Sequence, residues 1–493
     1  MMGLVGLLLA CFIWEPQQFE GLPVEIQWHD LNGDQREDLV AIVLRSKTIG
    51  SFTTYYQGGH LRGLYEDATE REFLLQSWLQ SEDGFQALPI VELGDSFLNL
   101  ALLGSRLFTL RDGVVLECFE FITANPAGWI HKKNIQIPLQ GVFSRHEMDW
   151  IWTREGKMFA LLPDLNGLFC TTLKREVETP YGESDSPTFF LPYPESMTQI
   201  EQHGSSIDMV TPTPQLIDID GDTELDLWFS SGKNRWLGLP VWDETGALTS
   251  IELIPYTLPG EIRDLDGDRL VDRLDMQAND SDVEGLKDLK NLSTHISVFR
   301  AKSSLQFPDQ PEFEQDLPGL LIADGDDDFQ LMAPFRDLNS DGRTDLATFG
   351  FKVSYMQVAR VATTGKMSMS FLLQLHVQEE SGRFRTLPGG PLKMKWKMDL
   401  RNLSMPELGQ LMADINGDGW MDVIMISDSH LTLHPITESG FLGEKPFKLK
   451  LPKAFREADQ VMGRDVDKDG RAEIMVVKLE GSRAKWIVLE VER

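Results

Sequence analysis

The sequence predicts an all-β protein assembled from repeated four-stranded units, and three observations lead to this prediction. Short runs rich in Val, Ile, Leu and Phe, bounded by Gly, Asp, Ser and Pro, are typical of strands and not of helices. A short acidic loop stands before many of these runs, and a Phe followed by Leu-Pro stands upstream of many loops. Recurrence at intervals of several tens of residues indicates a repeat architecture.

The clearest copy of the acidic loop lies in MADINGDGWMDVIMIS, from Met412 to Ser427. Counting from Asp414, side chains with oxygen atoms occupy loop positions 1, 3, 5 and 9, and position 7 offers a backbone carbonyl. Calcium takes about 6 to 8 oxygen ligands, and Gly417 and Gly419 allow the backbone to wrap closely around an ion. This order of residues predicts a calcium-binding loop.

Six full copies of the loop lie along the chain. We expect their side chains at positions 1, 3, 5 and 9 to be calcium ligands: Asp30, Asn32, Asp34 and Asp38; Asp218, Asp220, Asp222 and Asp226; Asp264, Asp266, Asp268 and Asp272; Asp337, Asn339, Asp341 and Asp345; Asp414, Asn416, Asp418 and Asp422; Asp465, Asp467, Asp469 and Glu473. Two eroded copies, VELGDSFLNL with Asp95 and DLNGLFCTT with Asp164, are expected to bind metal poorly or not at all.

Each unit contains about four strands, with the acidic loop between the first and the second. Four-stranded antiparallel sheets repeated around an axis form a β-propeller. Eight loop copies favour eight blades, with seven as the alternative. After Glu473 about two strands remain, and the segment from Phe19 to Pro23 has the pattern of a fourth strand. We therefore expect this N-terminal strand to complete the last blade, which removes the exposed sheet edges.

The motif D-x-[DN]-G-D-x-x-x-D, followed by Leu, Ile or Val, resembles the FG-GAP/VCBS repeat of integrin-α-like propellers. The resemblance covers nearly all of the chain beyond residue 15 and is to bacterial exported members of that family. It implies a propeller of seven or eight blades, structural calcium ions in the loops, and a ligand site on the opposite face.

The acidic loops have other interpretations. Calmodulin-type EF-hands share positions 1, 3 and 5, but they need flanking helices and a bidentate Glu at position 12, and the chain offers neither. Dockerins likewise place such loops between helices. Simple Asp/Gly turns without metal remain an alternative for the full copies and are favoured for the eroded ones.

The formal net charge of -31 fits loops that compensate bound cations, and it fits equally a solvated acidic surface. Strong acidity without a basic stripe argues against nucleic acid as a partner. The chain exceeds the roughly 250 to 300 residues at which single cores stop growing, a limit that a propeller avoids because each blade interface is a separate core.

The first 14 residues, MMGLVGLLLACFIW, are predicted to be a signal peptide or a lipoprotein signal, with residues 15–493 forming the propeller. Leu8-Leu9-Ala10-Cys11 resembles a bacterial lipobox with Cys11 as the lipidated residue, whereas a simple secretory signal or a structural N-terminus remain open. We expect an exported monomer, either a periplasmic or cell-surface lipoprotein or a secreted protein, that meets the membrane only through this anchor. Cys118 and Cys170 are predicted to be buried free thiols, with a disulfide as the alternative.

Two segments are candidate ligand sites. SFTTYYQGGHLRGLYED gathers Tyr55, Tyr56, His60, Arg62 and Tyr65, and SSGKNRWLGLPVW contains Arg235 and Trp236. Aromatic rings offer flat faces to sugars and peptides, and Arg forms bidentate hydrogen bonds with carboxylates. The alternative is that these aromatic side chains only pack loops onto the rim.

No H-E-x-x-H, G-x-S-x-G or glycine-rich phosphate loop occurs in the chain. We therefore expect a non-catalytic scaffold that binds a protein or carbohydrate ligand. A polysaccharide lyase or hydrolase on a calcium-bearing propeller, and a cell-envelope assembly factor that holds another protein, are the alternatives. An enzyme would bring His, Arg, Lys or Tyr together with perturbed pKa values, whereas a binding module would expose aromatic residues opposite calcium.

Overall fold

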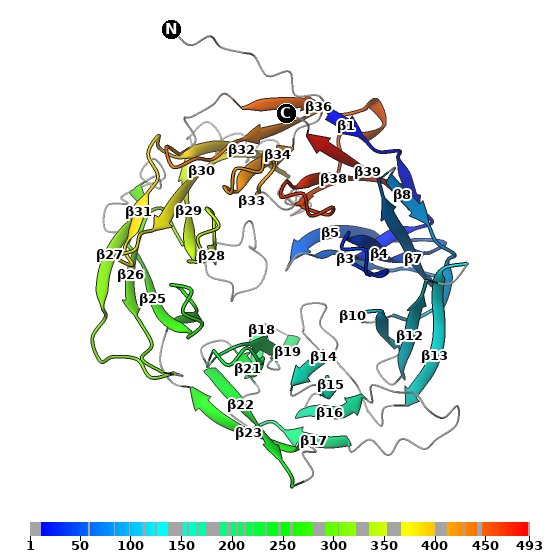
Figure 1. Ribbon diagram of the computed structural model, residues 1–493, viewed down its shortest axis with the longest axis horizontal. Helices are drawn as coiled ribbons and strands as arrows, with labels where there is room; N and C mark the ends of the chain where they lie inside the picture. Colours follow the sequence, from blue (N-terminus) through cyan, green and yellow to red (C-terminus); the bar gives the residue numbers. More distant parts are fainter. Residues whose placement is uncertain are drawn as a thin grey trace.

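The computed structural model has an all-β architecture, viewed down its shortest axis in Figure 1. It describes residues 11–491 except for 58–59, 83, 98, 112–114, 124–125, 137–150, 155–156, 165–166, 174–187, 195–198, 204–205, 211–212, 220, 232–233, 245–247, 257–259, 280–290, 304, 322–334, 353–365, 400–411, 427–428 and 441–445. Among these described residues, no helix is both long and apolar enough to cross a bilayer.

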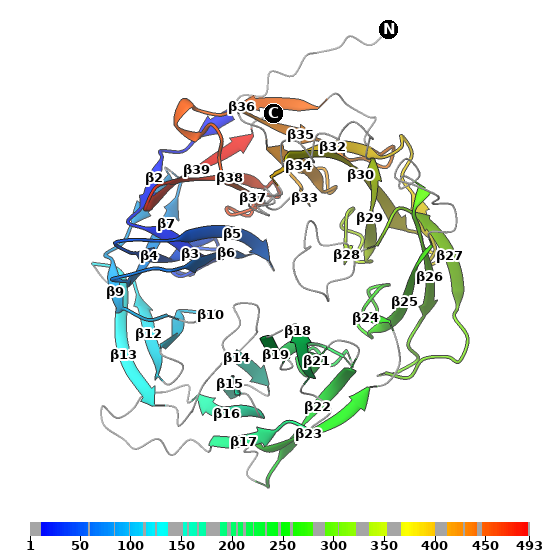
Figure 2. The ribbon, with the colours of Figure 1, turned by 180° about the vertical axis from the view of Figure 1, so that it is seen from behind.

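Eight antiparallel blades form a ring, so the predicted β-propeller is confirmed and the count is eight (Figures 1 and 2). In blades 2 to 7 the first strand lies nearest the axis and the last lies at the rim. Blades 1 to 4 contain, in order, β3 (Leu22–His29), β4 (Asp38–Arg45), β7 (Glu72–Ser81), β8 (Gly84–Ala87) and β9 (Val91–Gly94); β10 (Asn99–Leu103), β11 (Arg106–Arg111), β12 (Val115–Ile122) and β13 (Gly128–Gln136); β14 (Ile151–Arg154), β15 (Lys157–Asp164), β16 (Gly167–Leu173) and β17 (Thr188–Pro192); β20 (Thr213–Ile217), β21 (Asp226–Ser231), β22 (Asn234–Trp242) and β23 (Leu248–Tyr256).

Blades 5 to 8 repeat this plan. They contain β24 (Glu261–Arg263), β25 (Asp272–Asn279), β26 (Ser293–Phe299) and β27 (Phe313–Pro318); β28 (Phe335–Arg336), β29 (Asp345–Lys352), β30 (Lys366–Gln378), β31 (Phe384–Thr386) and β32 (Leu392–Asp399); β33 (Met412–Ala413), β34 (Asp422–Ile426), β35 (His430–His434) and β36 (Phe447–Lys450); β37 (Gln460–Arg464), β38 (Glu473–Glu480) and β39 (Arg483–Val491). A short 3₁₀ helix, η3 (Lys453–Phe455), links blades 7 and 8.

Two hairpins and a divided outer strand vary the plan. β5 (Ser51–Gln57) and β6 (His60–Glu66) form a hairpin on blade 1, and β18 (Gln199–His203) and β19 (Ser206–Val210) form another between blades 3 and 4. In blades 1 and 6 the outer strand is in two pieces, because β7 pairs with β8 and β9, and β30 pairs with β31 and β32.

The hydrophobic core is divided among the blade interfaces. Buried side chains form eight clusters, and each cluster joins two adjacent blades. A blade is apolar on both faces, so it is stable only when both neighbours cover it. The ring must therefore close.

An N-terminal strand closes the ring, as the sequence predicts. β1 (Cys11–Ile13) and β2 (Gln17–Phe19) both pair antiparallel with β39 and form the outer edge of blade 8. The predicted segment, Phe19 to Pro23, is placed too late, because Leu22 and Pro23 already begin β3. Gly21 makes this junction possible, since a Cβ there would lie 2.4 Å from the carbonyl oxygen of Leu44.

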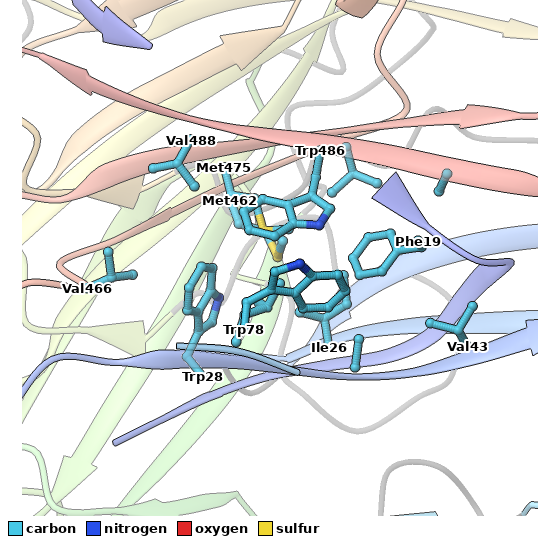
Figure 3. Close-up of a cluster of buried hydrophobic side chains, with 14 of the residues drawn as sticks. Phe19, Ile26, Trp28, Val43, Trp78, Met462, Val466, Met475, Trp486 and Val488 are labelled. Carbon is cyan, nitrogen blue, oxygen red and sulfur yellow. The ribbon is translucent and has the colours of Figure 1, made fainter. Parts of the chain in front are cut away.

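The cluster between blades 8 and 1 depends on this closure (Figure 3). The fully buried ring of Phe19 meets the ring of Trp78 edge-on at a centroid distance of 5.3 Å and lies 6.2 Å from that of Trp486. Trp14 is also buried, and its ring is 5.0 Å from that of Phe85. Residues from both ends of the chain thus share one core.

The predicted positions of the two eroded loops are wrong. Asp95 follows β9 in the connection from blade 1 to blade 2, and Asp164 ends β15, the second strand of blade 3. The first and second strands of blade 2 are instead joined by the two-residue turn Gly104-Ser105. The six full copies therefore belong to blades 1 and 4 to 8.

The closing strand gives a stability prediction. Phe19→Ala should lower the free energy of unfolding by about 3 to 5 kcal/mol, because it leaves a cavity between two blades. Gln18→Ala, on the exposed side of the same strand, is the matched control and should change it by less than about 0.5 kcal/mol. Urea unfolding followed by tryptophan fluorescence measures both, and equal effects would contradict closure through this core.

Candidate metal centres

The six acidic loops lie on one face of the ring. Each joins the first strand of a blade to the second, and that connection emerges at the same end of every blade. Blades 4, 5, 6, 7, 8 and 1 carry the loops, so they occupy consecutive places around the ring. Blades 2 and 3 interrupt the series.

Each loop contains two residues with left-handed backbone angles, at positions 4 and 6. In the blade 7 loop both are glycine, Gly417 with φ 72° and Gly419 with φ 86°. The other five loops place glycine at one of these positions and a residue with a side chain at the other: Gln35, Thr223, Arg269, Ser340 and Lys468. Left-handed angles strain such residues, so the loops store conformational strain that other contacts must offset.

Carboxylates at position 1 hold the turn together. Both oxygens of Asp414 accept hydrogen bonds, from the backbone N–H of Gly417 at 2.7 Å and of Gly419 at 2.9 Å. Asp30 accepts the same two bonds from Gly33 and Gln35. The side chain therefore orients the next positions toward a common centre.

Carboxylates at position 9 are buried and connect three parts of a blade. In blade 1, Asp38 accepts the N–H of Leu31 at 2.9 Å, at the start of the loop, and the N–H of Gln80 at 2.8 Å, in the third strand. Corresponding pairs of bonds reach Asp272, Asp345 and Asp422. This side chain thus fixes the loop to the body of its sheet.

Burial is the largest cause of the pKa shifts of these position 9 carboxyl groups. It raises the pKa of Asp38 and of Asp345 to about 6, and neighbouring carboxylates at positions 1 and 5 add to the effect while the backbone hydrogen bonds oppose it. Burial likewise raises the pKa of Asp272 and Asp422 to about 7 and that of Glu473 to about 8. A nearby cation would favour the ionised forms.

The residues present fit a hard divalent cation. Carboxylate oxygens of Asp264, Asp266 and Asp272 lie within 4.8 Å of one another, as do those of Asp465, Asp467 and Glu473. Among the described residues, Oδ1 of Asn339 and Oδ1 of Asp465 are buried without a hydrogen-bond donor. Such oxygen atoms, at ligand positions, lack a positive partner that calcium would supply. Asp220 lies outside the described residues.

Neighbouring loops are also bonded to each other, which sequence reasoning missed. The backbone N–H at position 8 donates to the position 2 carbonyl of the preceding loop in three cases, Glu37 to Val466, Thr344 to Leu265 and Met421 to Leu338, each at 2.8 Å. Ala472 donates instead to the position 1 carbonyl of Asp414, at 2.6 Å. Glu37 also forms an ion pair with Arg464 across the closing interface.

The first candidate ligand segment forms the β5–β6 hairpin. Tyr55 is paired with Arg62 in register, and Gln57 with His60 at the turn. β6 pairs with the inner strand β3, and β5 lies against β37 of blade 8, so the hairpin lies on the axial side of the closing interface (Figure 1). The structure therefore brings this segment toward the centre of the ring.

The remaining candidate residues have structural partners. Tyr65 is half-buried, and its ring is 6.1 Å from that of Phe73. Trp236 is 3% exposed and packs in the core between blades 3 and 4, so its ring is not available to a ligand. Arg235 binds the carbonyl of Gly260 and pairs with Glu261 at 3.1 Å, which joins blades 4 and 5.

Cys118 and Cys170 are buried free thiols, as the sequence predicts. Cys118 lies in the core between blades 2 and 3, and Cys170 lies in the core between blades 3 and 4. Burial raises the pKa of the Cys170 thiol.

The strained position 6 gives a reciprocal prediction. Thr223→Gly should raise the free energy of unfolding by about 1 kcal/mol, because Thr223 has φ 72° and is β-branched. Gly419→Thr, at the same position of the blade 7 loop, should lower it by a similar amount, since no atom obstructs a side chain there and only the backbone angle matters. Urea unfolding tests both, and changes of the same sign would contradict the strain.

Comparisons with known proteins give only distant likenesses. No family model matches the sequence, and no curated protein matches it. Among solved structures, the Photorhabdus luminescens Tc holotoxin pore is 15% identical with a TM-score of 0.30, over 91% of this chain and 20% of that one. A quinohemoprotein alcohol dehydrogenase from Pseudomonas putida HK5 is 10% identical with a TM-score of 0.33, over 85% and 72%. Saccharomyces cerevisiae Sqt1 is 10% identical with a TM-score of 0.29, over 86% and 93%. At these values they carry no argument about function, and the propeller is established by the strand pairings.

Proposed function

We propose that the protein is a non-catalytic, calcium-stabilised propeller that binds another protein through the β5–β6 hairpin at the centre of its ring. The observation that carries this proposal is the placement of the hairpin. It adds two strands to the inner edge of blade 1, where a four-stranded blade needs none. A propeller presents several blades around one axis, so a partner on the axis contacts them together.

Calcium would bind to the side chains at positions 1, 3, 5 and 9 of the loops. It would supply positive charge to the buried carboxylates and a partner to the oxygen atoms without donors. Because the position 9 groups of blades 1, 5, 6 and 7 are bonded to the body of their sheets, an occupied loop would transmit its stability to the blade. The role proposed for calcium is therefore structural.

We also infer export, since weak calcium sites of about 10⁻⁴ to 10⁻³ M fill outside cells. Lipidation at Cys11 is the export route that agrees best with ring closure. Processing immediately before Cys11 retains β1 whole, whereas removal of residues 1–14 would delete β1 and the buried Trp14.

The calcium proposal predicts a pH dependence. In chelator the melting temperature should fall as pH rises from 5 to 8, because the position 9 groups stay protonated in the native state up to pKa values of about 6 to 8 but ionise at lower pH when unfolded. Bound calcium should offset the cost of ionising these buried carboxyl groups, so the rise in melting temperature on adding calcium should grow with pH.

Two described histidines act in the opposite direction, because burial lowers the pKa of His376 and of His434. Burial lowers the pKa of His376 to about 4, and this side chain stabilises the native state increasingly as pH rises from 4 to 6.5. His376→Gln in parallel removes that contribution. A calcium effect that is absent, or equal at pH 5 and pH 8, would contradict metal binding by these loops.

The binding proposal is tested with the full chain in calcium. Protein captured from extracts of the producing cells after cross-linking should be lost when Tyr55, Tyr56 and Arg62 are all replaced by Ser. Replacement of Lys448 and Lys450 by Ser, two exposed lysines at the outer edge of blade 7, is the control and should leave capture unchanged. Captured candidates are then purified and their affinity for both variants measured.

The same variants are tested on a polysaccharide panel for retention and for chain cleavage. Retention that depends on the hairpin would replace the protein ligand by a carbohydrate. Cleavage would overturn the non-catalytic proposal in favour of a lyase or hydrolase. Equal capture by all variants would show that the hairpin only supports closure of the ring.

A further inference from the structure

The blade 4 loop lacks the preceding neighbour that the loops of blades 1, 6, 7 and 8 use. Blade 3 has no acidic loop, so no position 2 carbonyl from a preceding loop stands beside it. Two side chains from β14 contact this loop instead, as donors to its position 8 carbonyl. The indole N–H of Trp152 donates to the carbonyl of Leu225 at 2.7 Å, and Arg154 donates to the same carbonyl at 3.4 Å.

Arg154 also reaches the position 9 carboxylate of this loop. Its guanidinium donates to Oδ1 of Asp226 at 2.5 Å. In blades 1, 5, 6 and 7 the corresponding oxygen accepts a backbone N–H from the third strand of the same blade or the residues that follow it. The blade 4 loop therefore has a charged donor where those four loops have a neutral one.

The same guanidinium lies close to two more carboxylates. It is 3.6 Å from Asp222, at position 5, and 3.7 Å from Glu224, and only 14% of its side chain is exposed. Asp222 and Asp226 are two of the four expected calcium ligands in this loop. A mostly buried guanidinium that contacts both carboxylates would compete directly with a metal ion for their negative charge.

Arginines near other loops are placed differently. Arg343 pairs with Asp341 and Arg471 with Asp469, each within its own loop, and Arg300 pairs with Asp266 at 3.3 Å. Each of these contacts engages a carboxylate at position 3 or 5. None of these three ion pairs involves a position 9 carboxylate.

We propose that Arg154 is a built-in cation for the blade 4 loop, which consequently takes no calcium while loops without such an arginine do. The proposal rests on the calcium-stabilised scaffold described above and assigns a different state to one of its six loops. Arg154 acts here as a positioning residue for Asp222 and Asp226. Blade 4 is then joined to blade 3 by a permanent ion pair that calcium removal leaves in place.

The first test counts calcium ions bound per chain by equilibrium dialysis of the full-length protein. Arg154→Gln should bind one more ion than the wild type, because it removes the competing positive charge from the two ligand carboxylates. Arg154→Lys keeps a positive charge at the site and should bind the wild-type number. In chelator Arg154→Gln should melt below the wild type, and calcium should narrow that difference.

The second test leaves Arg154 in place and remains decisive if Arg154→Gln does not fold. Asp222→Asn should leave the number of bound ions unchanged, since that loop holds none. Asp418→Asn, at the same position of the blade 7 loop, has no ion pair among the described residues and should lower the number by one. Both variants keep the oxygen that accepts the position 7 N–H.

The outcomes separate this inference from the proposed function. A loss of one ion in Asp222→Asn, or an unchanged count in Arg154→Gln, overturns the role of Arg154 while calcium binding elsewhere stands. A wild type that binds no calcium overturns the calcium-stabilised scaffold. In that case one ion gained by Arg154→Gln would still support the role of Arg154, and none gained would overturn it too.

Discussion

Closure of the ring is the constraint on which the rest of the structure depends. Every blade is apolar on both faces, so eight blades need eight interfaces, and an open array would leave two faces in water. The closing interface is the only one made from both ends of the chain. Phe19, Trp78 and Trp486 pack there together, and the ion pair of Arg464 with Glu37 joins the same two blades at the loop face.

The position 9 carboxylate is the second point at which several requirements meet. Asp38 ends one turn, begins a strand and accepts hydrogen bonds from two other parts of its blade. These bonds satisfy backbone groups that burial would otherwise leave without partners. They also hold a carboxylate in a buried place, where burial opposes its charge. Stability of the turn and the proposed affinity for a cation would thus have the same structural origin.

The sequence was informative where a pattern is local. Loop positions 1 to 9 lie on one short segment, so spacing alone located all six full copies, and the apolar runs after them located the second strands. The segments with Asp95 and Asp164 were wrongly predicted to be eroded loops, because Asp, Asn and Gly occur in any turn. Neither segment has the acidic residue at position 9 that ends each full copy. The closing strand was placed too late because Leu22-Pro23, taken as the end of a fourth strand, begins a first strand instead.

Other features depend on contacts between distant segments. The β5–β6 hairpin had a readable signal, two glycines between β-rich runs, but its place at the inner edge of blade 1 is set by pairing with β3. Trp236 was expected to be a ligand residue, but its side chain packs in the core between blades 3 and 4. Arg154 carries no local motif at all. Its role becomes visible only when blade 3, without an acidic loop, stands beside blade 4.

The uneven distribution of the loops gives the ring an electric polarity. Acidic side chains crowd one face along six consecutive blades, whereas blades 2 and 3 leave a gap in that arc. A chain with a net charge of -31 therefore has a directional field, strongest over one sector. Such a field orients charged molecules that approach it, and calcium ions bound in the loops, as proposed, would weaken it. Under the calcium proposal, the concentration of divalent ions would then affect the orientation of encounters as well as the rigidity of the ring.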